Sequence, residues 1–510
     1  ELAEYCKHDV FLCEEIFRRL SHEYPAKELR LIDMTLKMYT QPVLVLDPNM
    51  LTDAILEEKE KRDELLQRLG VEEAALASNP KFAALLESLG VPAPRKVSKT
   101  TGKETLALAK NDALFQALLA GDREDVTALC EARLRVKSTT ERTRAQRFLD
   151  ISKRGSLPVP LSYYGAQTGR WTASKGSAIN MQNLKRGSFL RKAIMAPEGH
   201  ELVVGDLSQI EPRVLAWLAD YEDMLSIFRS GGDPYAAFGA QMFNIPGLTK
   251  DSHPDLRQSA KSALLGCGYG LGWASFAAQL LVGFLGAPPQ RYDKAFAKKL
   301  GVTQEYVDRF VDYEDNVKKM MDIPHICTTK ELLIHCVAAK KIIDIYRSTA
   351  HPVVSFWDMC GGLLESALYG GREFVYKCIT FRKEENVLPN GMSVRYANLR
   401  REKDKDTGQT NWVYGEEGVK PTKLYAGKIT NNIVQGTARI VMTDGMRRVA
   451  KRYPIAGTVH DELIAVVPTE EAAPALDWVL EQMTLEPKYM PGIPLDADGG
   501  HHVRYGLAKN

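Results

Sequence analysis

Residues 202–216 read LVVGDLSQIEPRVLA, in which a short apolar run ends at Gly205 and Asp206. Near the other end of the chain, Thr458 and Val459 lead into HDE at residues 460–462 before the strand pattern resumes over residues 463–467. A carboxylate placed where a strand stops is held by the sheet and points into the space beyond it. Two such carboxylates, here Asp206 and Asp461, can bridge a pair of Mg²⁺ ions whose charge stabilises an in-line phosphoryl displacement. Either aspartate alone would be an ordinary turn residue.

Four side chains between these aspartates recur every fourth position: Arg257, Lys261, Leu265 and Tyr269. On a helix each is turned by about 40° from the one before, so all four share one face. Such a face suits an incoming nucleotide, because the two cations can hold a triphosphate while the leucine and the phenol meet sugar and base. Taken alone, the pattern would equally fit a helix with solvated charges.

Together and in this order, the three segments resemble the palm motifs of the family A DNA polymerases, the DNA polymerase I family, and in particular its phage-type members. Residues 206–216 resemble the first motif, residues 257–270 the second, and VHDE at residues 459–462 the third. The resemblance implies that Asp206, Asp461 and the main chain of Leu207 bind the metal ions, with Glu462 supporting the catalytic site. It also implies that Gln209 and Glu211 contact the nucleotide, Glu211 selecting deoxyribose by filling the space beneath the sugar.

Two further segments extend the resemblance to DNA contacts. TGR at residues 168–170, followed by NMQNL at 180–184, resembles the segment that touches primer and template, and NNIVQG at 431–436 resembles the helix whose glutamine reads the minor groove. These side chains meet acceptors that every correct base pair presents there, so they sense pair geometry without selecting sequence. The implied DNA contacts are Arg170, Gln182, Asn183, Asn431, Gln435 and His460.

The fold that the resemblance implies is an α+β multidomain right hand, with an antiparallel palm sheet and a helical thumb and fingers. We assign residues 1–24 to the last helix of a 3′–5′ exonuclease domain, 25–150 to the thumb, 151–232 and 350–510 to the palm, and 233–349 to the fingers. The first assignment rests on Tyr5 and Asp9, which resemble the final exonuclease motif. Because one carboxylate cannot assemble a two-metal nuclease site, we expect this chain not to proofread.

The sequence also departs from the family pattern. Leu265 stands where an aromatic residue is common, and Tyr235 stands where a histidine is frequent. The stretch between Tyr269 and Gln435 is longer than the family usually needs, and its residues 401–417, with mixed charge and scattered glycines, are predicted to form a surface insertion.

Composition agrees with a globular protein that binds a polyanion. The chain has 510 residues, of which 45% are hydrophobic and 26% charged, and its net charge is only +2. Yet residues 133–192 contain fourteen Lys or Arg against Glu141 and Asp150, a local charge of +12. A solvated face normally mixes both signs, so this run favours nucleic acid as partner.

The eight cysteines contain no Cys-x-x-Cys pair, which is ordinary usage for a reducing compartment. His325, Cys327, His335 and Cys336 match no common zinc-ligand spacing and are predicted to be core and surface residues. The longest apolar stretch, residues 274–288, is too short to span a bilayer. We therefore expect no membrane partner and a location in the cytoplasm of a bacterial cell, with a phage as a candidate source.

The expected function is template-directed DNA synthesis in replication: addition of deoxynucleotides to a primer 3′-hydroxyl, with two Mg²⁺ ions and release of pyrophosphate. Primer-template DNA and dNTPs are the expected partners, with a processivity factor as a further candidate. One alternative is a single-subunit RNA polymerase, against which Glu211 and the His-Asp-Glu triplet argue. The other is an inactive DNA-binding accessory protein, which would need neither both aspartates nor the Arg257 and Lys261 pair.

Overall fold

The computed structural model describes residues 2–98, 102–110, 112–138, 140–177, 179–283, 287–324, 327–404 and 408–509, and the chain forms two compact units. The first unit contains Glu1–Leu51, Arg147–Gly231 and Pro352–Asn510. The second contains Thr52–Gln146 and Gly232–His351. Each unit is thus assembled from segments that lie far apart in the sequence.

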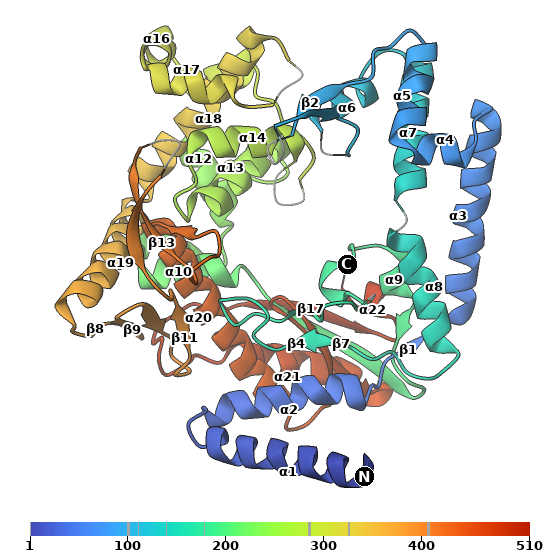
Figure 1. Cartoon of the computed structure of the whole chain (residues 1–510). Coiled ribbons are helices and arrows are strands. Elements are labelled where there is room, and N and C mark those ends of the chain that lie inside the picture. Colours follow the sequence, from blue (N-terminus) through green and yellow to red (C-terminus); the bar gives the residue numbers. More distant parts are fainter. Residues whose placement is uncertain are drawn as a thin grey trace. The chain divides into compact units, whose positions relative to one another are not determined.

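A four-stranded antiparallel sheet forms the centre of the first unit, with the strand order β15-β16-β7-β17 (Figure 1). Its strands are β7 (His200–Leu207), β15 (Ile455–Val459), β16 (Glu462–Pro468) and β17 (Ala497–His502). The apolar runs predicted to be strands form the buried middle of β7 and β16, where Val203, Val204 and Ile464 are wholly inaccessible. The strand predictions at both aspartates are therefore confirmed.

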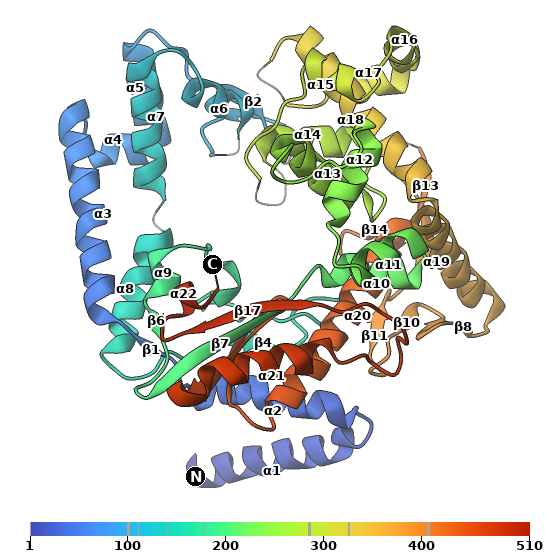
Figure 2. The ribbon, with the colours of Figure 1, turned by 180° about the vertical axis from the view of Figure 1, so that it is seen from behind.

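Gly205 explains how a helix can cover one face of this sheet. A side-chain carbon at Gly205 would lie 2.6 Å from Sδ of Met483 and 3.3 Å from Cγ1 of Val479, so glycine gives α21 (Ala472–Thr484) room to pack closely on β7. Successive residues of a strand point to opposite faces. Asp206 therefore points away from α21, toward the side on which Figure 2 shows α22 (Tyr505–Ala508).

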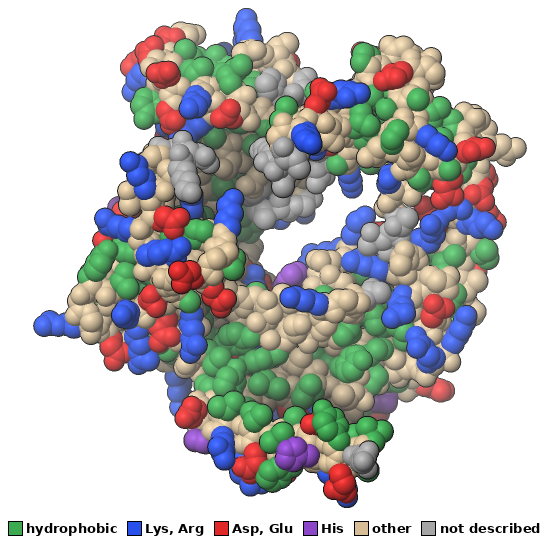
Figure 3. Space-filling view, in the orientation of Figure 1, with side chains coloured by type: hydrophobic (Ala, Val, Ile, Leu, Met, Phe, Trp, Pro, Cys, Tyr) green, Lys and Arg blue, Asp and Glu red, His purple; other side chains and the backbone are tan. Residues whose placement is uncertain are grey.

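The amino-terminal residues belong to the first unit. α1 (Leu2–Ser21) confirms the helix predicted over residues 4–20, and none of its residues is buried; its exposed apolar side chains are seen at the lower edge of Figure 3. α2 (Ala26–Thr40) packs against β15 and α20 (Ala426–Val449), and β1 (Val45–Leu46) follows. Residues 25–51 therefore belong to the same unit as the central sheet, whereas the assignment from sequence placed them in the thumb.

The further elements of the first unit are mostly short, apart from the long helix α19 (His351–Gly370). They are β4 (Leu161–Ser162), β5 (Thr172–Ala173), a 3-10 turn (Met181–Asn183), α9 (Phe189–Lys192), β6 (Ile194–Met195), α10 (Ile210–Leu218), α11 (Glu222–Arg229) and α19. Within the described chain, no helix is both long and apolar enough to cross a membrane.

Between α19 and α20 lies a strand-rich stretch, residues 374–424, here called the two-sheet segment. One antiparallel sheet contains β8 (Phe374–Tyr376), β9 (Ile379–Arg382), β10 (Glu385–Val387) and β11 (Ser393–Arg395); the other contains β12 (Arg400–Lys403), β13 (Thr410–Tyr414) and β14 (Thr422–Leu424). The predicted insertion at residues 401–417 is mostly exposed, but it is a paired hairpin of β12 and β13, since main-chain hydrogen bonds join Arg401 to Trp412 and their neighbours. Residues 405–407 of that prediction lie outside the described residues.

The first segment of the second unit is mainly helical, with one small hairpin. It contains α3 (Pro48–Leu69), α4 (Glu73–Ala77), α5 (Asn79–Ser88), β2 (Arg95–Val97), β3 (Glu104–Leu106), α6 (Ala113–Leu119), α7 (Glu124–Lys137) and the start of α8 (Thr140–Ser152). Phe82, Phe115 and Leu129 lie in its core. Arg133, counted above in the basic run, is buried there over the Phe82 ring and donates to the carbonyl of Leu76, so it does not face a polyanion.

The second segment of this unit confirms the helical block predicted over residues 233–347. Its elements are α12 (Pro234–Phe243), α13 (Pro254–Cys267), α14 (Trp273–Val282), α15 (Lys294–Lys299), α16 (Gln304–Asp312), α17 (Glu314–Met321) and α18 (Thr329–Thr349). α12 packs along α13, and α14 packs against α18.

His335 of α18 is fully buried, with both ring nitrogens engaged. Nδ1 accepts from the main-chain N–H of Tyr292 at 3.0 Å, and Nε2 lies 3.1 Å from the carbonyl oxygen of Ala277, to which it donates in the neutral ring. Burial lowers the pKa of His335 to about 4. His335 and Cys336 are core residues as predicted, whereas His325 lies outside the described residues.

This histidine predicts a loss of stability in mild acid. The unfolded chain binds a proton at the ring below about pH 6.5 but the folded chain only below about 4, so stability present above pH 6.5 is lost as the pH falls toward 4. His335→Gln is expected to shrink the difference in unfolding free energy between pH 7 and pH 5 by about 2 kcal/mol. Urea unfolding at both pH values measures it, with the exposed His351→Gln as control; equal differences in both variants would contradict the assignment.

Candidate active site

Asp206 and Asp461 meet at one end of the central sheet. Asp206 is the penultimate residue of β7, and Glu462, the first residue of β16, lies directly opposite it in the antiparallel register. Asp461 immediately precedes Glu462, and its carbonyl accepts from the main-chain N–H of Leu207 at 3.2 Å. Strand pairing therefore brings together two carboxylates that the sequence separates widely, each about one-fifth exposed.

Cationic side chains of the chain itself lie against both carboxylates. Lys509 Nζ is 2.8 Å and Arg186 Nη2 is 3.6 Å from Asp206 Oδ2. Arg170 Nη2 is 3.2 Å from Asp461 Oδ1 and also binds Glu211 at the start of α10. The site thus gathers three carboxylates whose charge is partly balanced by three cations.

The electrostatics of Asp461 follow from this crowding. Burial raises the pKa of its carboxyl group, Arg170 opposes the rise, and the negative charges of Glu211 and Asp206 add to it. A cation bound between these carboxylates would favour the charged form of Asp461. Carboxylate oxygens of this kind are the ligands that Mg²⁺ prefers, so the donor set fits a divalent ion.

Glu462 belongs to a separate, buried arrangement behind the aspartates. Its carboxylate accepts from Arg191 Nη2 at 3.2 Å and from the hydroxyl of Tyr505, and the Arg191 guanidinium lies 4.1 Å from the centre of the Tyr505 ring. Burial raises the pKa of Glu462, while the Tyr505 hydrogen bond and Arg191 oppose the rise. A carboxylate so fully engaged with its own chain fits a supporting role.

Gln182 fixes the turn that carries Asp461. Its Nε2 donates to the carbonyl of Thr458 at 2.6 Å, and its Oε1 accepts from the N–H of His460 at 3.1 Å. His460 itself is exposed with φ of +53°, a left-handed conformation that such a turn requires. Asn183 is the exposed last residue of the 3-10 turn that also carries Gln182.

Asn431 and Gln435 lie one turn apart on α20. Both are half-buried, whereas residues 432–434 between them are buried. Residues four apart share a helix face, so the two amides form a pair on the accessible stripe of an otherwise buried helix. Gln209, the residue before α10, adopts φ of +50° and sits at the helix start beside Glu211.

The predicted nucleotide face lies in the second unit on α13. Arg257, Lys261 and Leu265 are half-buried, and the remaining positions from Ser259 to Cys267 are mostly buried, so these three share one accessible face. The helix ends at Cys267, and Tyr269 lies in the turn beyond it, which corrects the prediction of four positions on one helix. Glycine at positions 268 and 270 favours this stop, since glycine disfavours a continuing helix.

Tyr235 of α12 faces the two cations of this face. The Arg257 guanidinium lies 5.3 Å and the Lys261 ammonium 5.7 Å from the ring centre, and Arg257 also donates to Asp233. Burial opposes ionisation of Asp233, but the Arg257 hydrogen bond prevails and lowers its pKa. In the sequence, Tyr235 stood out only because the family frequently has a histidine there. Its contact with Arg257 and Lys261 depends on the packing of α12 against α13.

Several residues around the carboxylates were not anticipated from the sequence. Lys509 and Tyr505 were not singled out in the sequence, while Arg186 and Arg191 were visible only as members of the basic run. Among the described residues, no cluster of three or more His, Cys, Asp or Glu side chains forms a ready-made metal cage. Any metal at Asp206 and Asp461 would therefore complete its coordination with main-chain oxygen, water or substrate.

Comparisons with known proteins identify the family of this chain. The family model described as DNA polymerase family A matches residues 50–355, more than half of the chain. The chain belongs to DNA polymerase family A. A DNA polymerase of Bacillus phage SP02 is 27% identical over 72% of this chain, and the DNA polymerase I of Pseudomonas aeruginosa is 32% identical over 47%.

The fold is that of a family A polymerase domain. The POL domain of Pol1 from M. smegmatis, solved in complex with a DNA primer-template and dNTP, superposes on 94% of this chain with a TM-score of 0.62 at 18% identity. The chain covers 70% of that structure, 56% of the phage polymerase and 26% of the Pseudomonas enzyme. It therefore spans about half the length of one curated relative and about a quarter of the other.

Proposed function

We propose that this family A polymerase chain catalyses template-directed DNA synthesis, adding deoxynucleotides to a primer 3′-hydroxyl and releasing pyrophosphate, in DNA replication. The observation that carries the proposal is the meeting of Asp206 and Asp461 at the end of β7 and β16. Members of the family are metal-dependent. Two Mg²⁺ ions held by Asp206, Asp461 and the main chain of Leu207 would stabilise the charge that develops in the displacement.

The other residues then have distinct tasks. Glu462, held by Arg191 and Tyr505, keeps the start of β16 in place. Arg257 and Lys261 bind the triphosphate, with Gln209, Leu265 and Tyr269 near the nucleotide and Glu211 beneath its sugar. The contacts to primer-template DNA come from Arg170, Gln182, Asn183, Asn431, Gln435 and His460. A processivity factor remains a candidate partner, and the cytoplasm of a bacterial cell the proposed location.

Primer extension tests this function against its alternatives. The chain is mixed with a primed template, Mg²⁺ and either the four dNTPs or the four rNTPs. We expect templated extension with dNTPs and strong discrimination against rNTPs, reduced in Glu211→Ala. Extension with rNTPs at a comparable rate would favour an RNA polymerase, and tight duplex binding without extension would favour an accessory protein.

Leu265 gives a prediction about nucleotide analogues. In the family, an aromatic residue at this position lies near the sugar, and a tyrosine hydroxyl there can stand in for the missing 3′-hydroxyl of a dideoxynucleotide. Leu265→Tyr is therefore expected to relax discrimination against dideoxynucleotides by roughly ten-fold, as one satisfied hydrogen bond of about 1.4 kcal/mol implies. Single-nucleotide incorporation kinetics give the ratio, and Leu265→Phe is the matched control without the hydroxyl. An equal loss of activity on both nucleotides would instead indicate overpacking of α13.

A further inference from the structure

Arg170 is presented by a tight turn, residues 166–170, here called the Arg170 turn. The N–H of Ala166 donates to the carbonyl of Arg170 at 3.1 Å, and that of Gly169 donates to the carbonyl of Ala166 at 2.9 Å. Gly169 has φ of +79°, and a side-chain carbon there would lie 2.7 Å from the Tyr164 ring. The turn thus rests directly on Tyr164, which precedes it in the chain.

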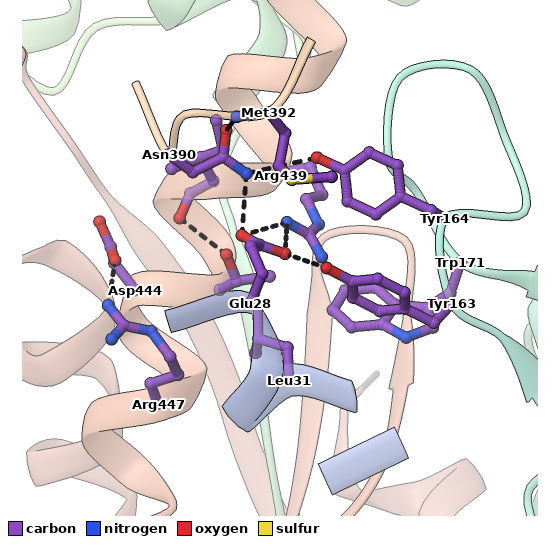
Figure 4. A network of polar contacts seen from close by, with 12 residues as sticks. Glu28, Leu31, Tyr163, Tyr164, Trp171, Asn390, Met392, Arg439, Asp444 and Arg447 are labelled. Atoms are coloured by element: carbon purple, nitrogen blue, oxygen red, sulfur yellow. Dashed lines mark hydrogen bonds and ion pairs between the residues drawn. The ribbon is translucent and has the colours of Figure 1, made fainter. Parts of the chain in front are cut away.

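A buried ion pair lies behind this turn (Figure 4). Arg439 of α20 donates from Nη1 to both carboxylate oxygens of Glu28 of α2, at 2.8 and 2.7 Å, and both side chains are 2% exposed. The Arg439 guanidinium also lies 4.9 Å from the ring centre of Tyr164 and 4.8 Å from that of Trp171. The two aromatic residues that flank the Arg170 turn are therefore fixed against one guanidinium.

The main chain of α20 also touches the turn. A side-chain carbon at Gly436 would lie 3.5 Å from the carbonyl oxygen of Thr168 and 2.5 Å from Cδ1 of Leu388. Gly436 follows Gln435, and Arg439 lies one helical turn beyond Gln435. The same short stretch of α20 therefore carries a proposed DNA contact and packs against the Arg170 turn.

The two-sheet segment forms hydrogen bonds at two points near this turn. Asn390 Nδ2 donates to Glu28 Oε1 at 2.8 Å and to the Tyr164 hydroxyl at 3.3 Å, as Figure 4 shows. At the second point, Gln167 Nε2 donates to the carbonyl of Arg395 at 2.7 Å, while the Tyr414 hydroxyl donates to Gln167 Oε1 at 3.0 Å. Gln167 is otherwise exposed, so both of its amide atoms are held by the two-sheet segment.

We propose that the two-sheet segment, residues 374–424, positions Arg170, through Asn390 at the buried ion pair and through Tyr414 at Gln167. The inference rests on the proposed function, because Arg170 matters only if it serves the Asp461 site and the primer-template. Both contacts are polar and directional: Tyr414 bonds Gln167 within the Arg170 turn, and Asn390 bonds Tyr164, against which the turn packs. A sheet that only covered the protein surface would not require hydrogen bonds to both polar atoms of the exposed Gln167 side chain.

The test compares the full chain with Gln167→Leu, Tyr414→Phe and Asn390→Ala. Each is expected to lower kcat/KM for primer-template roughly three- to ten-fold, the range of one or two hydrogen bonds, without changing the KM for dNTP. Tyr369→Phe is the matched control, because Tyr369 is 68% exposed and lies in the same region against Trp412. Hydrogen exchange of the amides of residues 166–170 should become faster in the three variants and remain unchanged in the control.

An Arg170→Ala background decides whether the effect passes through Arg170. If the two-sheet segment acts by positioning Arg170, Gln167→Leu and Tyr414→Phe have no further effect on kcat/KM once Arg170 is alanine. The proposal would be overturned if these substitutions lowered kcat/KM in the Arg170→Ala background by the same factor as in the unaltered chain. It would also be overturned if the hydrogen exchange of residues 166–170 were unchanged in the single variants. Failure of the unaltered chain to extend any primer would instead reject the proposed function, and the exchange of residues 166–170 would still report on the positioning.

Discussion

Alanine at Asp206 or at Asp461 is expected to lower the rate of nucleotide addition by at least roughly 1,000-fold, about 4 kcal/mol of barrier. The reason is geometric, because strand pairing between β7 and β16 brings these two carboxylates together at the end of the sheet, where they are proposed to hold metal. Binding of primer-template should change little, since the lost oxygens are assigned to the metal and not to the duplex. Single-turnover extension and fluorescence anisotropy measure the two quantities separately.

Asp498→Ala provides a matched control for this prediction. Asp498 lies opposite Asp206 on β17, and its carboxylate is 3.5 Å from the same Lys509, but its side chain is 72% exposed. It has no assigned metal role, so its removal should leave most of the extension rate intact. If either the Asp206 or the Asp461 variant kept more than about a tenth of the activity, the two-metal assignment would be wrong.

Methionine at Arg439 is expected to lower the free energy of unfolding by about 3–5 kcal/mol, because it leaves Glu28 buried without its cation. The side chain of Arg439 is enclosed by Tyr163, Tyr164 and Trp171, so the variant also loses contacts between the cation and the aromatic rings. Urea unfolding followed by tryptophan fluorescence measures the effect, with Trp171 as a probe inside the network.

Two further variants separate the ion pair from general packing. Arg452→Met removes a pair with Glu471 in which both side chains are about half exposed, and it should cost less than about 1 kcal/mol. The double variant Glu28→Gln with Arg439→Met should be more stable than Arg439→Met alone, since it removes the uncompensated charge. A loss below about 1 kcal/mol in Arg439→Met would show that the network contributes little to stability.

The elements around Asp206 and Asp461 could be predicted because their signals are local. An apolar run that stops at glycine and aspartate specifies a buried strand and its end, and the helix of Arg257 follows from its spacing. The four-residue spacing predicted Tyr269 on the same helix as Arg257. The helix ends at Cys267 instead, where the glycines at positions 268 and 270 disfavour its continuation. Arg133 and Arg191 were misread for the opposite reason: their charge suggested a polyanion, but burial against Leu76 and Glu462 gives each an internal partner.

The sequence by itself determined the strands at Asp206 and Asp461, the helices over residues 4–20 and around Arg257, and the order of the carboxylates, since each depends on residues only a few positions apart. The tertiary structure decided which cations lie against those carboxylates and what holds the Arg170 turn. Lys509 reaches Asp206 across 303 positions, and Arg439 reaches Glu28 across 411. Charge pairing depends on distance in space and on burial, and neither quantity is contained in the local pattern of a chain. Only the packing of α20, α2 and the central sheet brings these partners within hydrogen-bonding distance.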